Sequence, residues 1–200
     1  MNVSNQKYCT IGIMSGTSLD GVDIALCNFE KEDEEWRFNL LKTNTYPYSQ
    51  EWKNNLSNAY KSGKEDIWKL HEQYGEFLGA TVKEFLSGRS EKINFISSHG
   101  HTIFHKPQKG ITFLLGDGSS IASTTGIITI SDFRSLDVSL GGQGAPLVPI
   151  GDEFLFSDYA CFINIGGIAN ISFRKRNNRD FKTRNSKKNY SIYSDNVLFF

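Results

Sequence analysis

A loop of small residues between two short apolar segments is the feature that most constrains this chain. Residues 8–14 and 22–29 are apolar runs of strand length, and the seven residues between them, Ser15-Gly16-Thr17-Ser18-Leu19-Asp20-Gly21, hold two glycines and three hydroxyls. Glycine permits tight turns with exposed N–H groups, so such a loop can cradle an anion. The pattern predicts a strand, a phosphate-binding loop and a second strand. An ordinary hairpin turn uses the same residue types and stays open as an alternative.

Two carboxylates accompany this loop. Asp20 and Asp23 supply the hard oxygens that a Mg²⁺–phosphate complex requires. The loop has no lysine, which excludes the Gly-x-x-x-x-Gly-Lys-Ser/Thr phosphate loop, and Gly-x-Gly-x-x-Gly does not occur in the chain.

The rest of the chain predicts an α/β fold with polar residues at strand ends. Residues 36–46 alternate as a third strand, and residues 62–88 carry a helical apolar stripe that opens with a Ser62/Glu65 capping box. Further short strands are expected at 93–97, 112–115 and 127–130, with Ser119 capping a short helix and a hairpin at 159–173. Since each strand delivers polar residues to its end, we expect a ligand crevice there.

Three histidines follow the strand at 93–97. His99, His101 and His105 lie within seven residues, a density found in zinc sites, and a metal-dependent hydrolase is one hypothesis. Cysteine and carboxylate ligands are absent nearby, which favours a turn that hydrogen-bonds a polar ligand or its own loop.

A second charged group precedes a glycine-rich loop at 141–146. Arg134 can make a bidentate contact with a carboxylate or phosphate, and Asp132 or Asp137 can orient it or accept a proton. A structural ion pair among the three is the alternative.

Composition narrows the class of protein. The 22 basic and 22 acidic residues cancel, so charge gives no reason to expect nucleic acid or a membrane surface as partner. Cys9, Cys27 and Cys161 lie in apolar runs, which is typical of reduced thiols, and no signal peptide or spanning segment is evident, so a cytoplasmic location is expected. The basic stretch from 174 has no periodicity and predicts an irregular tail.

Taken in order, these motifs resemble the anhydro-N-acetylmuramic acid kinases of bacterial cell-wall recycling. The resemblance rests on five stretches: IGIMSGTSLDGVDIAL, SSHGHTIFHKP, LLGDGSSIA, SDFRSLDVSLGGQGAPLVP and INIGGIANISF. It implies an actin-like ATPase fold (ribonuclease H-like) with a mixed sheet and flanking helices. The implied domains are 1–128, the start of a second domain at 129–173, and the tail at 174–200.

The resemblance also implies the activity and its residues. Family enzymes use ATP and Mg²⁺ to open the anhydro ring of the sugar with water and phosphorylate O6, giving N-acetylmuramate 6-phosphate. Arg134 and Asp137 match the sugar side of the cleft, and Gly166, Gly167 and Asn170 match a second phosphate-side hairpin. The ATP-binding loop corresponds to Gly16, Thr17, Ser18, Leu19, Asp20, Gly21, Val22 and Asp23.

The chain departs from the family pattern after the hairpin. The family continues into a Phe-Asp-x-Gly-Pro-x-Asn segment whose aspartate is the expected general base, and these 200 residues contain no such segment. We therefore expect an incomplete second domain and a chain that is inactive by itself. A catalytically dead nucleotide- or muramic-sugar-binding module is the alternative, and homodimer formation by a full-length form is left open.

Overall fold

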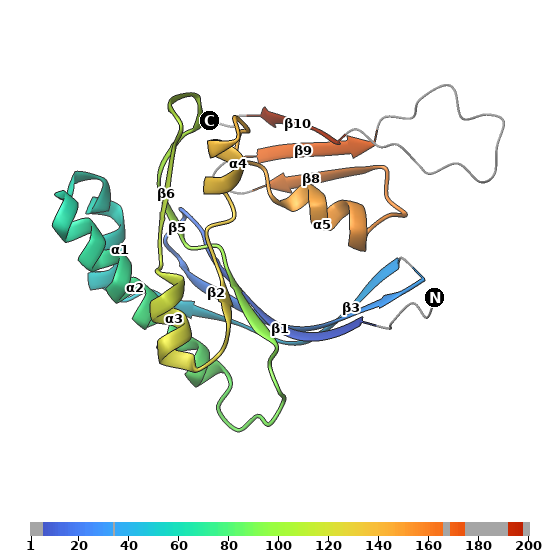
Figure 1. The fold of residues 1–200 in the computed structure, drawn as a ribbon, viewed down its shortest axis with the longest axis horizontal. Coiled ribbons are helices and arrows are strands. Elements are labelled where there is room, and N and C mark those ends of the chain that lie inside the picture. The colour runs from blue at the N-terminus through green and yellow to red at the C-terminus, as the bar shows by residue number, and fades with distance from the viewer. Residues whose placement is uncertain (1–5, 34, 166–168, 175–191, 198–200) are drawn as a thin grey trace. The chain divides into compact units, whose positions relative to one another are not determined.

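The structure is a computed structural model that describes residues 6–33, 35–165, 169–174 and 192–197 (Figure 1). The chain divides into two compact units, Met1–Ala145 and Pro146–Phe200. In the first unit the elements are β1 (Gln6–Ser15), β2 (Gly21–Glu32), β3 (Glu35–Pro47), α1 (Gln50–Asn58), η1 (Ala59–Lys61), α2 (Lys64–Phe85), β4 (Phe95–Ser98), β5 (His101–Lys106), η2 (Pro107–Lys109), β6 (Ile111–Leu115), α3 (Gly118–Thr125), β7 (Thr129–Ile130) and α4 (Ser135–Ser139).

A five-stranded mixed sheet is the frame of the first unit. Its order is β3-β2-β1-β4-β7, with β1, β2 and β3 antiparallel and β4 and β7 added in parallel. This confirms the predicted mixed sheet with flanking helices and the predicted strands at 8–14, 22–29 and 36–46. Strand β7 pairs with β4, so residues 129–130 belong to the sheet of the first compact unit. The assignment of either unit to a family domain stays a prediction.

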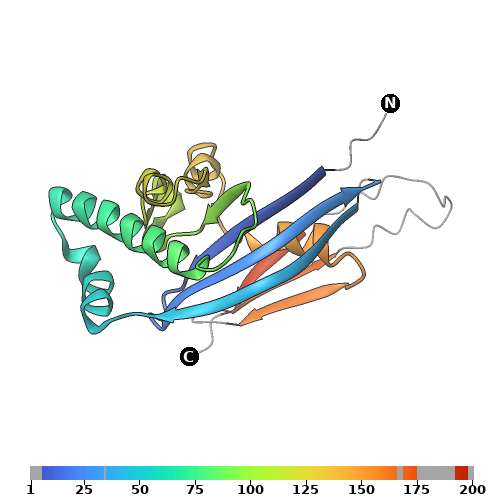
Figure 2. The same ribbon diagram turned by 90° about the horizontal axis from the view of Figure 1, so that it is seen from below.

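Helix α2 covers one face of this sheet, as Figure 2 shows. The predicted apolar stripe is confirmed, since Tyr74, Leu78, Val82 and Phe85 are fully buried against the strands. Burying side chains of this size stabilises the unit by about 1.5–3 kcal/mol each. Within the residues that the structure describes, no helix combines the length and apolar character that a membrane crossing needs.

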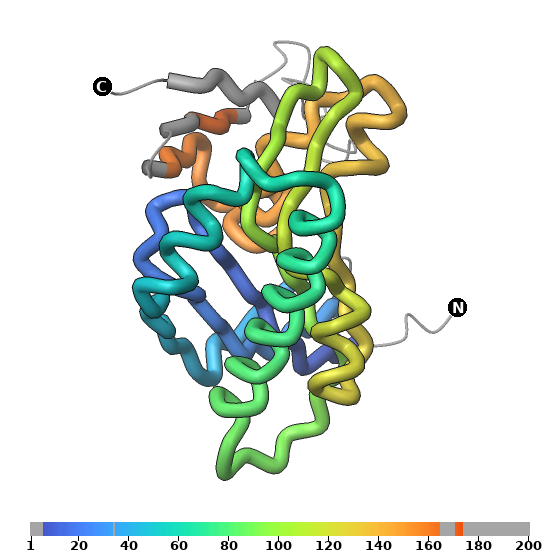
Figure 3. Tube along the Cα trace, turned by 90° about the vertical axis from the view of Figure 1, so that its left-hand side faces the viewer, coloured from blue at the N-terminus to red at the C-terminus, as the bar shows by residue number. Residues whose placement is uncertain are grey.

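Two glycines on α2 allow α3 to approach closely, and the two helices run side by side in Figure 3. A Cβ atom at Gly75 would lie 2.5 Å from the Asp117 carbonyl oxygen, and one at Gly79 would lie 2.6 Å from Cβ of Thr124. The approach is fixed by a backbone bond of 3.1 Å from the Asp117 N–H to the His71 carbonyl.

Both predicted helix caps are wrong. Ser62 ends the preceding turn η1, where its N–H bonds Ala59, so α2 begins after Gly63 without a side-chain cap. The cap of α3 is Asp117, whose Oδ2 accepts the Ser120 N–H at 2.7 Å, and not Ser119. In both cases the preceding segment's conformation decided which residue could reach the free N–H groups. Helix α1, capped by Ser49, had not been predicted.

The second unit contains α5 (Val148–Leu155), β8 (Cys161–Ile165), β9 (Ala169–Arg174) and β10 (Ile192–Val197). Strands β8 and β9 pair antiparallel, as predicted for the hairpin at 159–173. Strand β10 extends this sheet through β9, which departs from the irregular tail expected over 174–200. Backbone hydrogen bonds to an open strand edge can order a segment whose sequence has no periodicity.

We predict opposite effects of alanine at two helical glycines. Gly75→Ala should lower the free energy of unfolding by about 1–3 kcal/mol, because the new methyl group meets the α3 backbone. Gly151→Ala, in α5 with open space around it, should leave stability unchanged or raise it by up to about 1 kcal/mol. Urea denaturation followed by circular dichroism measures both. A loss of equal size in the two variants would contradict the close packing of α2 and α3.

Candidate functional site

The loop between β1 and β2 holds an unusual backbone conformation. Leu19 has φ of 57°, in the left-handed region that disfavours side chains with a Cβ. Its N–H lies 3.5 Å from the Gly16 carbonyl, and its side chain packs against the core. Thr17 and Ser18 are exposed, whereas Val22 is fully buried in the core and could reach a ligand only through its backbone.

The hydroxyl of Ser15 does not face the loop, contrary to the expectation of three hydroxyl donors there. Ser15 is 1% exposed, and its Oγ lies 2.9 Å from Tyr48 Oη, 2.7 Å from Tyr74 Oη and 3.4 Å from His101 Nδ1. We call these four residues the hydroxyl cluster. Burial lowers the pKa of His101 to about 4, so its ring is neutral, and burial raises the pKa of both tyrosines. The cluster therefore ties the end of β1 to α2 and β5 without charge.

The loop carboxylates are exposed and fit a hydrated cation. Asp20 Oδ1 accepts the Ser18 hydroxyl at 2.7 Å and the Gly21 N–H at 3.1 Å, and these bonds lower the pKa of Asp20. Asp23 Oδ1 accepts the Thr45 hydroxyl at 2.6 Å. Each carboxylate is thus oriented at the surface, and oxygen donors of this kind suit Mg²⁺ with its remaining waters.

Arg134 is held by His99, a contact that the sequence analysis does not predict. The Nδ1–H of His99 donates to the Gly100 carbonyl at 2.8 Å, so Nε2 is the acceptor for Arg134 Nη2, also at 2.8 Å. Arg134 Nη1 donates to the Gly144 carbonyl, and Nε is buried without a hydrogen-bond partner among the described residues. The guanidinium is half-buried, which lowers its pKa, and the described residues place no carboxylate oxygen within 4.0 Å of it.

The two nearby aspartates stabilise loops. Asp137 Oδ2 accepts the Gly144 N–H at 2.6 Å, and a Cβ at Gly142 would collide with the Asp137 carboxylate. Asp132, at φ of 54°, accepts the Ser135 N–H at 3.2 Å and hydroxyl at 2.7 Å. The alternative of an ion pair with Arg134 is therefore wrong, since both carboxylates bond to other groups.

The three histidines point to separate partners. His105 Nδ1 lies 3.2 Å from the Thr112 hydroxyl, while His99 and His101 bond to the groups given above. Across residues 6–33, 35–165, 169–174 and 192–197, no three His, Cys, Asp or Glu side chains converge as a metal ion would require. Of the second hairpin, Asn170 pairs with Asn164 through the backbone, and Gly166 and Gly167 lie outside the described residues.

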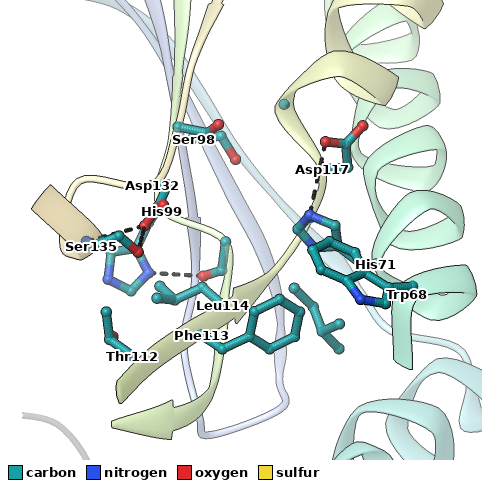
Figure 4. A pocket seen from close by; sticks show the side chains of 15 residues that line it. Trp68, His71, Ser98, His99, Thr112, Phe113, Leu114, Asp117, Asp132 and Ser135 are labelled. Carbon is teal, nitrogen blue, oxygen red and sulfur yellow. Dashed lines mark hydrogen bonds and ion pairs between the residues drawn. The ribbon is translucent and has the colours of Figure 1, made fainter. Parts of the chain in front are cut away.

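A cavity of about 390 Å³ opens beside these groups in the first unit (Figure 4). We call it the α2–β6 pocket. Trp68 and His71 line it from α2, and His99 lies on the other side. Its remaining polar and aromatic lining includes Ser98, Phe113, Asp117 and Asp132.

Sequence reasoning missed Trp68 and His71. They flank the apolar stripe of α2, and a tryptophan three residues before a histidine was the available signal in the sequence. Their role depends on the position of β6, since the Phe113 ring centroid lies 5.8 Å from that of Trp68 and 5.3 Å from that of His71.

The family profile and the curated relatives that match this chain indicate the same family. The profile of the anhydro-N-acetylmuramic acid kinase family matches residues 8–183. An anhydro-N-acetylmuramic acid kinase of Vibrio cholerae is 42% identical over 183 residues, covering 86% of this chain and 48% of that protein. One of Pseudoalteromonas translucida is 38% identical over 184 residues, covering 84% and 46%. The chain thus spans about half the length of the curated relatives it matches.

Solved structures give only weak likenesses. A hexokinase from Schistosoma mansoni complexed with glucose aligns with 94% of this chain and 40% of its own, at 11% identity and a TM-score of 0.37. An Aquifex aeolicus PPX-GPPA enzyme aligns at 11% identity with a TM-score of 0.32, covering 94% and 52%. Likenesses this weak do not assign a fold, and the actin-like fold stays what the sequence resemblance implies.

We predict that the hydroxyl cluster stabilises the first unit. Tyr74→Phe should lower the free energy of unfolding by about 1 kcal/mol, because Ser15 and Tyr48 keep each other as partners but lose the third hydroxyl. The control is Tyr60→Phe, at an exposed tyrosine, which should change stability by less than about 0.5 kcal/mol. Urea denaturation measures the difference, and equal stabilities would refute the role of the cluster.

We also predict a pH dependence from His101. The pKa of His101 is about 4 in the folded protein, against an ordinary value of 6.5 in the unfolded chain. As the pH falls, the unfolded chain therefore binds the proton before the folded protein does. Stability should therefore fall between pH 6.5 and pH 4 as acid is added. Replacing it by a side chain that cannot titrate, His101→Asn, should reduce the loss between pH 7 and pH 5 by about 1–2 kcal/mol. An unchanged pH profile would show that His101 titrates normally.

Proposed function

Because this chain belongs to the anhydro-N-acetylmuramic acid kinase family, we propose that it binds ATP with Mg²⁺ and an anhydro-N-acetylmuramic acid, and contributes to phosphorylation of that sugar. The observation that supports this most strongly is the strained loop between β1 and β2, with its oriented surface carboxylates. A side chain kept at positive φ is stabilised by surrounding structure and often marks a functional site.

The loop is proposed as the nucleotide-phosphate site. Its glycines allow close approach of backbone N–H groups to phosphate oxygens, and Thr17 and Ser18 add exposed hydroxyls. Asp20 and Asp23 would hold Mg²⁺, which when bound neutralises phosphate charge. The depressed pKa of Asp20 keeps its carboxylate ionised across the neutral range.

Arg134 is proposed to contact the sugar or the transferred phosphoryl group. A half-buried guanidinium without a carboxylate partner is suited to an anion, and His99 and Gly144 fix its orientation. Asp137 acts through the glycine loop that it holds and positions the Gly144 carbonyl for Arg134. Gly166, Gly167 and Asn170 are proposed as a second phosphate-side segment, by resemblance alone.

The proposed reaction couples two displacements, one at C1 of the sugar and one at the γ-phosphorus of ATP. A water oxygen adds to C1 of the sugar as the bond from C1 to the bridging O6 breaks, and O6 takes the γ-phosphoryl group of ATP, leaving ADP. Such transfer depends mainly on positioning and charge stabilisation. The proton from the attacking water requires a general base, which the family pattern places in the Phe-Asp-x-Gly-Pro segment that these residues do not contain.

We predict that MgATP slows hydrogen exchange in residues 16–23. Asp20→Asn should weaken MgATP binding on the order of tenfold, because one charged oxygen donor is lost. Asp33→Asn is the control, at an equally exposed aspartate that follows the far end of β2, and it should leave binding unchanged. Exchange measured by mass spectrometry with and without MgATP tests both. Unchanged exchange in the loop at saturating nucleotide would count against this site.

Sugar phosphorylation separates kinase from binding module. The chain is assayed alone and fused to the C-terminal half of the Vibrio cholerae relative, with release of ADP and formation of the sugar phosphate measured together. Activity in the fusion supports the kinase proposal. A fusion that folds and binds MgATP but forms no sugar phosphate supports a binding module instead.

A further inference from the structure

The α2–β6 pocket contains a buried hydroxyl that none of the described residues satisfies. Ser98 is 0% exposed, and its Oγ has no hydrogen-bond partner among the described residues. His71 Nδ1, also on the pocket wall, is buried and unpartnered in the same way. Buried polar atoms are nearly always hydrogen-bonded, so two orphans on one cavity indicate a ligand with matching groups.

The aromatic part of the lining and the volume of the pocket indicate the size and surface of a ligand that would fit. Trp68 is 59% exposed at the mouth, with its ring edge-on to Phe113 and His71. The volume of about 390 Å³ is at the small end of ligand pockets and accommodates a monosaccharide or one of its substituents. The site therefore offers aromatic contact surface and a few convergent polar groups.

We propose that the α2–β6 pocket binds the N-acyl group of the amino sugar, with Ser98 as the donor to its carbonyl oxygen. The amide N–H would then donate to a pocket carboxylate or to neutral His71, and the methyl group would contact Trp68 and Phe113. Burial lowers the pKa of His71, so its ring stays neutral and one ring nitrogen can accept a hydrogen bond. This inference rests on the proposed function, since it assigns an orientation to the same sugar.

Charge decides which end of the sugar enters the pocket. Asp117 and Asp132 both line it, so a carboxylate there would meet two like charges. The guanidinium of Arg134 lies against His99 at the pocket edge, with Nε unpartnered. The neutral acylamino group thus belongs in the pocket, and the lactyl carboxylate of the muramic sugar lies toward Arg134.

The test compares three sugars by isothermal titration calorimetry with the whole chain. They are 1,6-anhydro-N-acetylmuramic acid, the same sugar with a hydroxyl in place of the acetamido group, and 1,6-anhydro-N-acetylglucosamine, which lacks the lactyl group. Ser98→Ala should weaken both acetamido sugars by about three- to tenfold and leave the hydroxyl analogue unchanged. Ser97→Ala, the neighbouring serine on β4 and absent from the pocket lining, should change none of them.

Thermal unfolding provides a second readout. Because the Ser98 hydroxyl has no partner in the part of the chain that the structure describes, Ser98→Ala should not lower the melting temperature, so weaker binding would not reflect misfolding. Equal weakening of the hydroxyl analogue, or no effect of Ser98→Ala on any sugar, would overturn the acyl-pocket assignment while leaving the proposed function standing. If none of the three sugars binds, the proposed sugar site fails and this inference fails with it.

Discussion

The close approach of α2 and α3 fixes the geometry on which the pocket depends. Gly75 and Gly79 present no side chains at the contact, so the start of α3 lies against the α2 backbone and Asp117 bonds to His71. As a result, the residues that line the pocket from α2 and those that follow β6 keep a fixed separation. A protein interior packed at this density does not yield to an added methyl group without a shift of backbone.

The hydroxyl cluster fixes the geometry of the loop between β1 and β2. Ser15 is the last residue of β1, and its bonds to Tyr48, Tyr74 and His101 anchor the strand end from which the loop departs. A neutral imidazole suits this position, since a charge there would be buried without a counter-charge. The positive φ of Leu19 is tolerated because both ends of the loop are held, by the cluster on one side and by the core contacts of Val22 on the other.

The charged side chains of the site bond to neutral groups and not to one another. The Asp20 carboxylate is exposed and its pKa is lowered, and the Arg134 guanidinium is half-buried and bonded to neutral acceptors. Removing a charge from water without a counter-charge is costly, so a half-buried guanidinium bonded to neutral acceptors is suited to an anionic ligand. Asp132 and Asp137 do not neutralise Arg134, because their oxygens are engaged by Ser135 and by the glycine loop.

The sequence alone determined the strands of the main sheet, the buried stripe of α2 and the family, because alternation, helical spacing and ordered motifs are local properties. It also identified the loop and Arg134 as candidates for the site. Only the tertiary structure decided that Ser15 turns inward, that His99 orients Arg134, and that Trp68, His71 and Ser98 share a cavity. Those outcomes depend on which distant segments meet. A hydroxyl or an imidazole can hydrogen-bond within a buried cluster or in a ligand site, and only its neighbours in space decide between the two.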